Sequence, residues 1–152
     1  MKNLVNKEVN KIKEGYLEMI KNLDPDYFVT LTFAYDVNLF YAQQTMNKYL
    51  HHVNKAIYGR NKEKLRCFSF IEEDSLKRLH YHLLIKNPSI NRSINLKNIL
   101  YKKWISLKGT GYSSFNGDGW FREMKTSKDK TSVAKYVIKQ TTCNRFPLDN
   151  LN

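Results

Sequence analysis

Two histidines separated by one residue stand in an otherwise apolar segment, Leu-His-Tyr-His-Leu-Leu-Ile, at residues 79–85. The aromatic and aliphatic side chains of this segment predict a β-strand. Because successive side chains in a strand point to opposite faces, His80 and His82 point the same way. The opposite face is apolar and is expected to cover a core. The histidine face must then be covered by polar groups or left open, which limits how the strand can be placed in a fold.

A second strand and a short polar loop precede the histidine strand. Residues 66–73 are rich in aromatic and apolar side chains, and the five residues after them are mostly polar or charged, so an antiparallel hairpin is expected. Such a hairpin can bring Glu72 beside His80 and His82. Glu73 is the alternative if the strand contains a one-residue bulge.

Two imidazoles and a carboxylate have the chemistry of a metal site. A carboxylate that follows apolar strand residues is costly unless a partner compensates its charge. The three groups leave coordination positions open, so they can hold Mg²⁺ or Mn²⁺ with room for a phosphate oxygen. A lone His-x-His pattern is about as often an incidental part of a solvated strand face, so the carboxylate favours the metal.

The rest of the chain alternates helical and strand-like patterns. Apolar residues at helical spacing predict four helices, and two further aromatic and β-branched stretches predict strands. We expect the last helix to begin after an N-cap at Thr131 and Ser132, and Gly109 to end the helix before it. No repeat or linker is evident, so one domain covering residues 1–152 is expected. The expected helices are residues 4–23, 40–58, 96–107 and 133–142, and the further strands are residues 27–33 and 120–125.

The last expected helix carries a tyrosine on its polar face. Tyr136 shares this face with Lys139 and Gln140, because residues three and four apart are neighbours on a helix. In a helix that stands alone, such a tyrosine is more often a half-buried aromatic whose hydroxyl meets water. Beside a metal site the balance reverses, since a bound cation can stabilise the charge that develops on a phenol and a lysine can hold a phosphate. The combination suits phosphoryl transfer through a covalent phosphotyrosine.

The charge of the chain favours a polyanionic partner. The 152 residues carry 26 Lys and Arg against 14 Asp and Glu, a net charge of +12. Residues 1–74 carry 11 basic and 10 acidic side chains, whereas residues 75–152 carry 15 and 4. Nucleic acid is therefore favoured, with its contacts on elements from the second half. The basic side chains expected to contact DNA are Lys77, Arg78, Arg122 and Lys135.

Cysteine content and hydropathy exclude other classes of protein. Cys67 and Cys143 stand far apart in unrelated patterns, so they supply neither a zinc tetrad nor a disulfide framework. No apolar run approaches the roughly 20 residues that cross a bilayer, and the first residues lack the apolar stretch of a secretory signal. A cytoplasmic protein without a membrane partner is therefore expected. The chain has no GxxxxGK[ST] motif, so a helicase would have to be a separate protein.

Three motifs in order resemble those of replication initiator endonucleases of the HUH superfamily, the rolling-circle Rep proteins of plasmids, phages and single-stranded DNA viruses. FVTLTF at residues 28–33 resembles their first strand motif, LHYHLLI at residues 79–85 the histidine motif, and YVIK at residues 136–139 the tyrosine motif. The HxH and YxxK patterns are weak alone, but the order and spacing make the set fairly specific. The resemblance implies an α+β fold, a central antiparallel sheet flanked by helices, similar to the RNA-recognition-motif fold.

The resemblance also implies a role for each motif residue. His80 and His82 would bind the divalent metal, with Glu72 as the third ligand. Tyr136 would attack a phosphodiester of single-stranded DNA at an origin or hairpin, leaving a 5′-phosphotyrosine and a free 3′-OH. Lys139 would place or neutralise the reacting phosphate. The motif has one tyrosine, so closing a circle would need a second subunit or another nucleophile.

Two alternatives remain open from the sequence. A single-tyrosine transposase of the insertion-sequence type would use a glutamine four residues after the tyrosine as a metal ligand, and Gln140 has that spacing from Tyr136. Glu72 in the metal shell favours the initiator over the transposase. A non-catalytic nucleic-acid-binding domain would need only basic side chains and exposed aromatics. The aromatic candidates are Tyr112, Phe115, Phe121 and Trp120, of which Trp120 is expected in the core.

Overall fold

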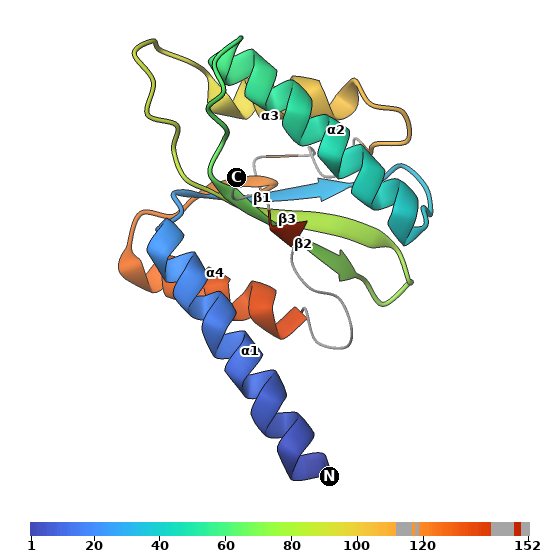
Figure 1. Cartoon of the computed structure of the whole chain (residues 1–152). Coiled ribbons are helices and arrows are strands. Elements are labelled where there is room, and N and C mark those ends of the chain that lie inside the picture. Colours follow the sequence, from blue (N-terminus) through green and yellow to red (C-terminus); the bar gives the residue numbers. More distant parts are fainter. Residues whose placement is uncertain (112–116, 118, 141–147, 150–152) are drawn as a thin grey trace.

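Helices cover both faces of an antiparallel sheet in the computed structural model (Figure 1). This arrangement confirms the α+β fold class. The residues that the structure describes are 1–111, 117, 119–140 and 148–149. The helices are α1 (Lys2–Leu23), α2 (Leu39–Tyr58), α3 (Leu96–Ile105) and α4 (Ser127–Gln140). The strands are β1 (Tyr27–Thr32), β2 (Cys67–Glu73), β3 (Leu79–Ile85), β4 (Phe121–Glu123) and β5 (Leu148–Asp149).

The histidine strand β3 occupies the centre of the sheet, whose order is β4-β1-β3-β2-β5. Strands β2 and β3 form the expected antiparallel hairpin, and their register runs without interruption from Cys67 opposite Ile85 to Glu73 opposite Leu79. The one-residue bulge that would have favoured Glu73 as a ligand is therefore absent. Strand β1 pairs with the other edge of β3, so it is an interior strand, as expected.

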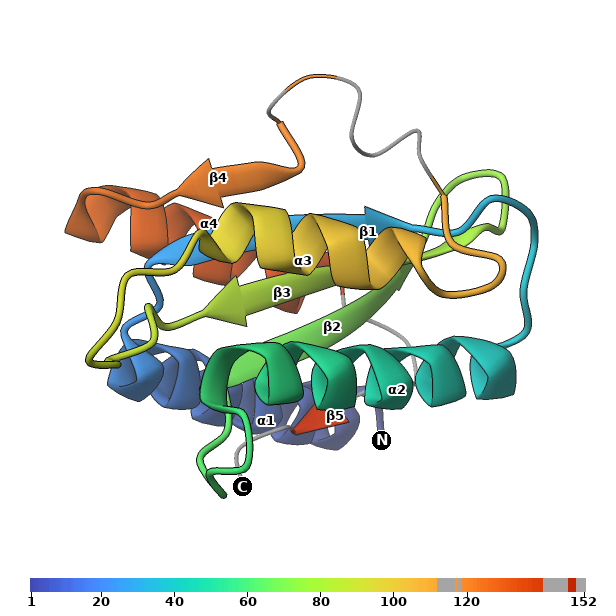
Figure 2. The same cartoon turned by 90° about the horizontal axis from the view of Figure 1, so that it is seen from above.

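The two faces of the sheet contact different pairs of helices. Helices α2 and α3 lie over one face (Figure 2), where the apolar side of β3 is fully buried, as expected. Helices α1 and α4 lie over the other face. The expectation that polar groups or solvent would meet the histidine face was wrong for most of its length, because apolar side chains from β2 and β3 pack there against the two helices. These side chains include Phe68, Phe70, Leu84, Ile20, Val137 and Ile138.

Two helix boundaries differ from the sequence expectation. Helix α4 begins at Ser127, six residues before the expected start, so the N-cap assigned to Thr131 and Ser132 was wrong. The Thr126 hydroxyl accepts a hydrogen bond from the Asp129 N–H, and the Asp129 carboxylate accepts one from the Thr126 N–H. This reciprocal pair is a capping box, which satisfies two N–H groups at the helix start.

The end of α3 also lies earlier than expected. The helix ends at Ile105 with Ser106 as its C-cap, so Gly109 does not end it. Gly109 instead adopts a φ of 83° in the turn that leads back toward β1, where its carbonyl accepts a hydrogen bond from the Ala34 N–H. None of the helices among the described residues is long and apolar enough to span a membrane.

Two glycines provide opposite tests of the packing. A Cβ at Gly111 would lie 2.9 Å from the backbone of Phe33, whereas Gly15 in α1 has no atom within 4 Å of that position. Gly111→Ala is therefore expected to lower the free energy of unfolding by about 1–3 kcal/mol, and Gly15→Ala to raise it by about 0.5–1 kcal/mol. Urea denaturation of the two variants measures both effects, and equal stabilities would contradict the close approach at Gly111.

Candidate active site

The carboxylate of Glu72 and the imidazoles of His80 and His82 meet near the closed end of the β2–β3 hairpin. Glu72 lies opposite His80 in the register, and His82 is two residues along the same face. One carboxylate oxygen, Oε2, lies 2.9 Å from Nε2 of His80 and 2.6 Å from Nε2 of His82. The hairpin prediction is thus confirmed in its geometry, and the three side chains converge on one point.

These three groups fit a divalent cation. Each offers one ligand atom, and the three atoms lie within 4.8 Å of one another. The set contains two nitrogens and one oxygen, which suits Mn²⁺ better than Mg²⁺, because Mg²⁺ prefers oxygen ligands and retains water. Only three protein ligands are supplied, so positions for a phosphate oxygen would stay open.

The surroundings of His82 hold its imidazole in one orientation. The Thr30 hydroxyl on β1 lies 3.1 Å from Nδ1 of His82, which leaves Nε2 directed at Glu72. Phe28, also on β1, stacks on the His82 ring with 5.0 Å between ring centroids. A hydrogen bond to the second ring nitrogen of a metal-binding histidine fixes its tautomer and raises metal affinity. Thr30 and Phe28 therefore support the site, although the sequence analysis gave neither of them a role.

Burial also sets the protonation of His82, whose exposed fraction is 5%. Desolvation lowers the pKa of His82 below its usual value, and the contact with Glu72 opposes this shift only in part. The imidazole is therefore neutral at neutral pH. Neutral imidazole is the form that can bind a metal ion.

A pH dependence of stability follows from the lowered pKa of His82. The unfolded chain takes up a proton at this imidazole first, so the metal-free protein is expected to lose stability as the pH falls below about 6.5. The loss is at most about 1.4 kcal/mol per pH unit and stops below the pKa of the folded state. Urea denaturation between pH 5 and 7.5 should show this slope in the wild type and a weaker one in His82→Gln. The same slope in both proteins would contradict a buried neutral histidine.

Helix α4 places Tyr136 next to the three converging groups. Val133, Ala134 and Val137 on the apolar stripe of the helix are buried against the sheet, while Tyr136 stays 43% exposed. The ring of Tyr136 lies 5.7 Å from that of His82, edge to face, and 6.3 Å from that of Phe28. The tyrosine and the histidine pair are far apart in sequence, yet the fold makes their rings neighbours.

The phenol of Tyr136 is not activated by the protein alone. Partial burial raises its pKa, and the negative charge of Glu72 raises it further. The hydroxyl is therefore protonated at neutral pH. A divalent cation bound at the three converging groups would oppose both effects, because positive charge favours the phenolate.

The other residues expected on α4 lie around this tyrosine. Lys139 is exposed one turn after Tyr136, as the helical spacing requires. Lys135 is exposed and lines a groove of about 510 Å³ between α1 and α4. Gln140 is the last residue of α4, and its side chain lies outside the part of the chain that the structure describes.

The basic residues of the hairpin loop are held by acidic neighbours. Arg78 forms an ion pair of 2.9 Å with Asp74, whose carboxylate also accepts the backbone N–H of Arg78. Lys77 adopts a positive φ of 65°, and its ammonium lies 4.0 Å from Glu73. Glu73 points away from the histidines because it pairs with Leu79 in the register. The loop is thus adjacent to the three converging groups, with its charges partly neutralised.

Arg122 lies on the same face of the sheet as the histidines. It is exposed on β4, opposite Phe28 of β1, and directly opposed residues share a face. Trp120 before it is buried, as expected, and Phe121 is partly buried, so neither is an exposed stacking platform. Tyr112 and Phe115, the other aromatic candidates, lie outside the described residues.

Comparison with known proteins identified one family. A family model described as a replication-associated protein of the ORF2 type matches residues 26–144, well over half of the chain. No curated protein and no solved structure matched the chain. The matched residues include all three motifs and the residues that converge in the structure.

Proposed function

Because the chain belongs to this family of ORF2-type replication-associated proteins, we propose that it initiates DNA replication as an HUH-type endonuclease that nicks and rejoins single-stranded DNA. The observation that carries this proposal is the position of Tyr136 beside the converging groups of Glu72, His80 and His82. A nucleophile next to three metal-ligating groups is the arrangement that phosphodiester cleavage through a covalent intermediate requires.

In the proposed reaction, the Tyr136 oxygen attacks the scissile phosphorus. A bond forms between this oxygen and phosphorus, the bond from phosphorus to the 3′ oxygen breaks, and the phenolic proton is lost while the leaving oxygen gains one. The products are a 5′-phosphotyrosine and a free 3′-OH. Glu72, His80 and His82 would hold a divalent cation, which supplies positive charge to the phosphate oxygens. Lys139 would pair with a phosphate oxygen, which orients the phosphate for attack.

The site supports the endonuclease over the alternatives. A transposase that relied on Gln140 would not need a carboxylate between the two histidines, yet Glu72 lies within 3 Å of both. A domain that only binds nucleic acid would not need to bury a carboxylate and two imidazoles, since partly buried charge is costly without a function or a partner. The sequence also contains no helicase motif, so we propose that a separate helicase acts with this protein.

Covalent capture of DNA tests the proposal directly. The purified protein is incubated with a library of single-stranded oligonucleotides and Mn²⁺, and DNA that stays attached after denaturation is sequenced. A defined cleavage sequence with a phosphate on Tyr136, found by mass spectrometry, is the expected result. Attachment should disappear when a chelator replaces Mn²⁺. A library screen without any covalent adduct would contradict the proposed chemistry.

A further inference from the structure

Residues 60–66, here called the basic segment, carry four positive charges that the site does not use. Arg60, Lys62, Lys64 and Arg66 are all exposed, and none of their side chains has an ion pair or hydrogen bond to another described residue. Glu63 is the one acidic residue within the segment. Four unpaired cations in seven residues produce a local positive potential that is not cancelled by neighbours.

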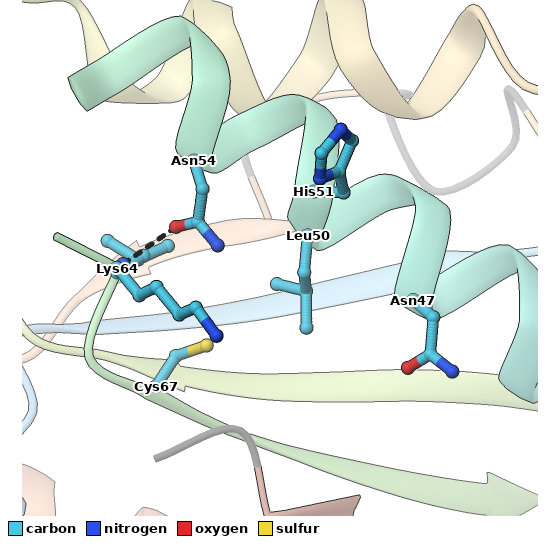
Figure 3. Close-up of a pocket in the computed structure, with 7 residues that line it drawn as sticks. Asn47, Leu50, His51, Asn54, Lys64 and Cys67 are labelled. Atoms are coloured by element: carbon cyan, nitrogen blue, oxygen red, sulfur yellow. Dashed lines mark hydrogen bonds between the residues drawn. The ribbon is translucent and has the colours of Figure 1, made fainter. Parts of the chain in front are cut away.

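The basic segment connects α2 to β2 and is held in place by the fold. Leu65 near its C-terminal end is buried with an exposed fraction of 2%, and its N–H donates to the Asn54 side chain on α2 at 2.7 Å. Figure 3 shows the Asn54 amide directed at the segment, with Lys64 beside it. Because Leu65 points inward, its neighbours Lys64 and Arg66 are directed outward. The cations are thus presented on an anchored stretch of backbone.

Hollows lie on both sides of the segment. One cavity of about 200 Å³ lies between α2 and Lys64, and another of about 440 Å³ extends past Tyr58 and Arg66. Lys86, which lines the second cavity, is already paired with Asp24 and Asp26. Partly buried aromatic surface next to free cations is typical of surfaces that bind the backbone of nucleic acids.

The segment lies at the opposite end of the hairpin from the tyrosine. Arg66 continues the register opposite Lys86, as the hydrogen bond from the Lys86 N–H to the Arg66 carbonyl shows. It is six residues from Glu72 along β2, a separation of about 20 Å in an extended strand. Helices α1 and α4 cover the sheet between the two places (Figure 1), so a DNA strand must pass around the outside of the molecule to reach both.

We propose that the basic segment is a second DNA-contact surface, which binds backbone phosphates of the DNA beyond the nucleotides held at Tyr136. This inference rests on the proposed function, because it assumes that DNA is the polyanion. The chemistry that recognises phosphate is the same for a single strand and for a hairpin duplex. An acidic protein is the competing ligand, and it would not need DNA of a particular length.

Charge reversal in a length series tests the surface. The test variant carries Lys62→Glu, Lys64→Glu and Arg66→Glu, and the control carries the equal change Lys2→Glu, Lys7→Glu and Lys11→Glu on the exposed start of α1. Both are made in the Tyr136→Phe protein, so that binding is measured without cleavage. Fluorescence anisotropy with single strands and hairpins of increasing length, at several salt concentrations, gives the affinities. A glutamine version of each triple variant separates loss of charge from repulsion.

The proposal predicts a loss of affinity that grows with DNA length. For long DNA the test variant should bind about 10-fold or more weakly than the control, and its log–log salt slope should fall by about 2, since each phosphate contact on a single strand contributes roughly 0.7. Equal affinities of test and control variants at every length would overturn the proposal. Whether the single strand or the hairpin shows the larger loss identifies the DNA form. Covalent capture by the wild type is a separate measurement, so failure of the proposed chemistry and failure of this surface are distinguishable.

Discussion

Replacement of Tyr136 with phenylalanine is expected to abolish covalent attachment to DNA. The substitution removes only the hydroxyl, and the ring can keep its contacts with His82 and Phe28. Loss of a catalytic nucleophile lowers the rate by at least about 10³-fold, and the residual rate comes from other parts of the site. Affinity for single-stranded DNA should change by less than about threefold, because binding depends mainly on phosphate contacts.

The matched control for this experiment is Tyr35→Phe. Tyr35 is exposed like Tyr136 but lies in the connection between β1 and α2, and it should keep full cleavage activity. Denaturing gel electrophoresis with a labelled oligonucleotide and Mn²⁺ measures the adduct, and anisotropy measures binding. Full attachment by Tyr136→Phe would show that another residue is the nucleophile. A parallel loss of adduct and of DNA affinity would instead favour a binding role for the tyrosine.

The sequence predicts those parts of the site that depend on local geometry. Alternation along two neighbouring strands and a short loop were sufficient to place Glu72 beside His80 and His82. Helical spacing was sufficient to place Tyr136 on the exposed side of its helix. In both cases the residues concerned are close in sequence, so the regular periods of strand and helix determine where the side chains point.

The supporting residues could not be predicted because they depend on long-range pairing. Thr30 reaches His82 only because β1 lies beside β3 with Thr30 opposite His82, and 52 residues separate the two. The alternation within β1 showed that Phe28 and Thr30 share a face, but it did not indicate which strand would be its neighbour. The cover of the histidine face by α1 and α4 was missed for the same reason.

Charge totals over half of the chain concealed the basic segment. Residues 1–74 carry 11 basic and 10 acidic side chains, which led us to expect DNA contacts only in the second half. The acidic side chains of this half lie elsewhere in the fold, and two of them, Asp24 and Asp26, pair with Lys86 and Lys130. Local charge depends on which side chains are already paired, and this is a property of the structure.

Replacement of Glu72 with glutamine is expected to remove most of the affinity for Mn²⁺. Glutamine has nearly the same shape, but its neutral amide is a much poorer ligand for a divalent cation. The wild type should gain about 2.7 kcal/mol of stability when the free metal concentration is 100 times the dissociation constant. In Glu72→Gln this gain should nearly vanish, and the yield of DNA adduct should fall with it.

Glu73→Gln distinguishes a metal ligand from a general effect of charge. Glu73 is the next residue on the same strand and has the same charge, but it lies opposite Leu79 and away from the histidines. Thermal unfolding with increasing Mn²⁺ should show the full metal response in Glu73→Gln and almost none in Glu72→Gln. Equal responses in the two variants would contradict metal binding at the three converging groups. Thr30→Val should lie between them, because loss of a hydrogen bond to a ligating histidine weakens metal affinity by about 10–100-fold.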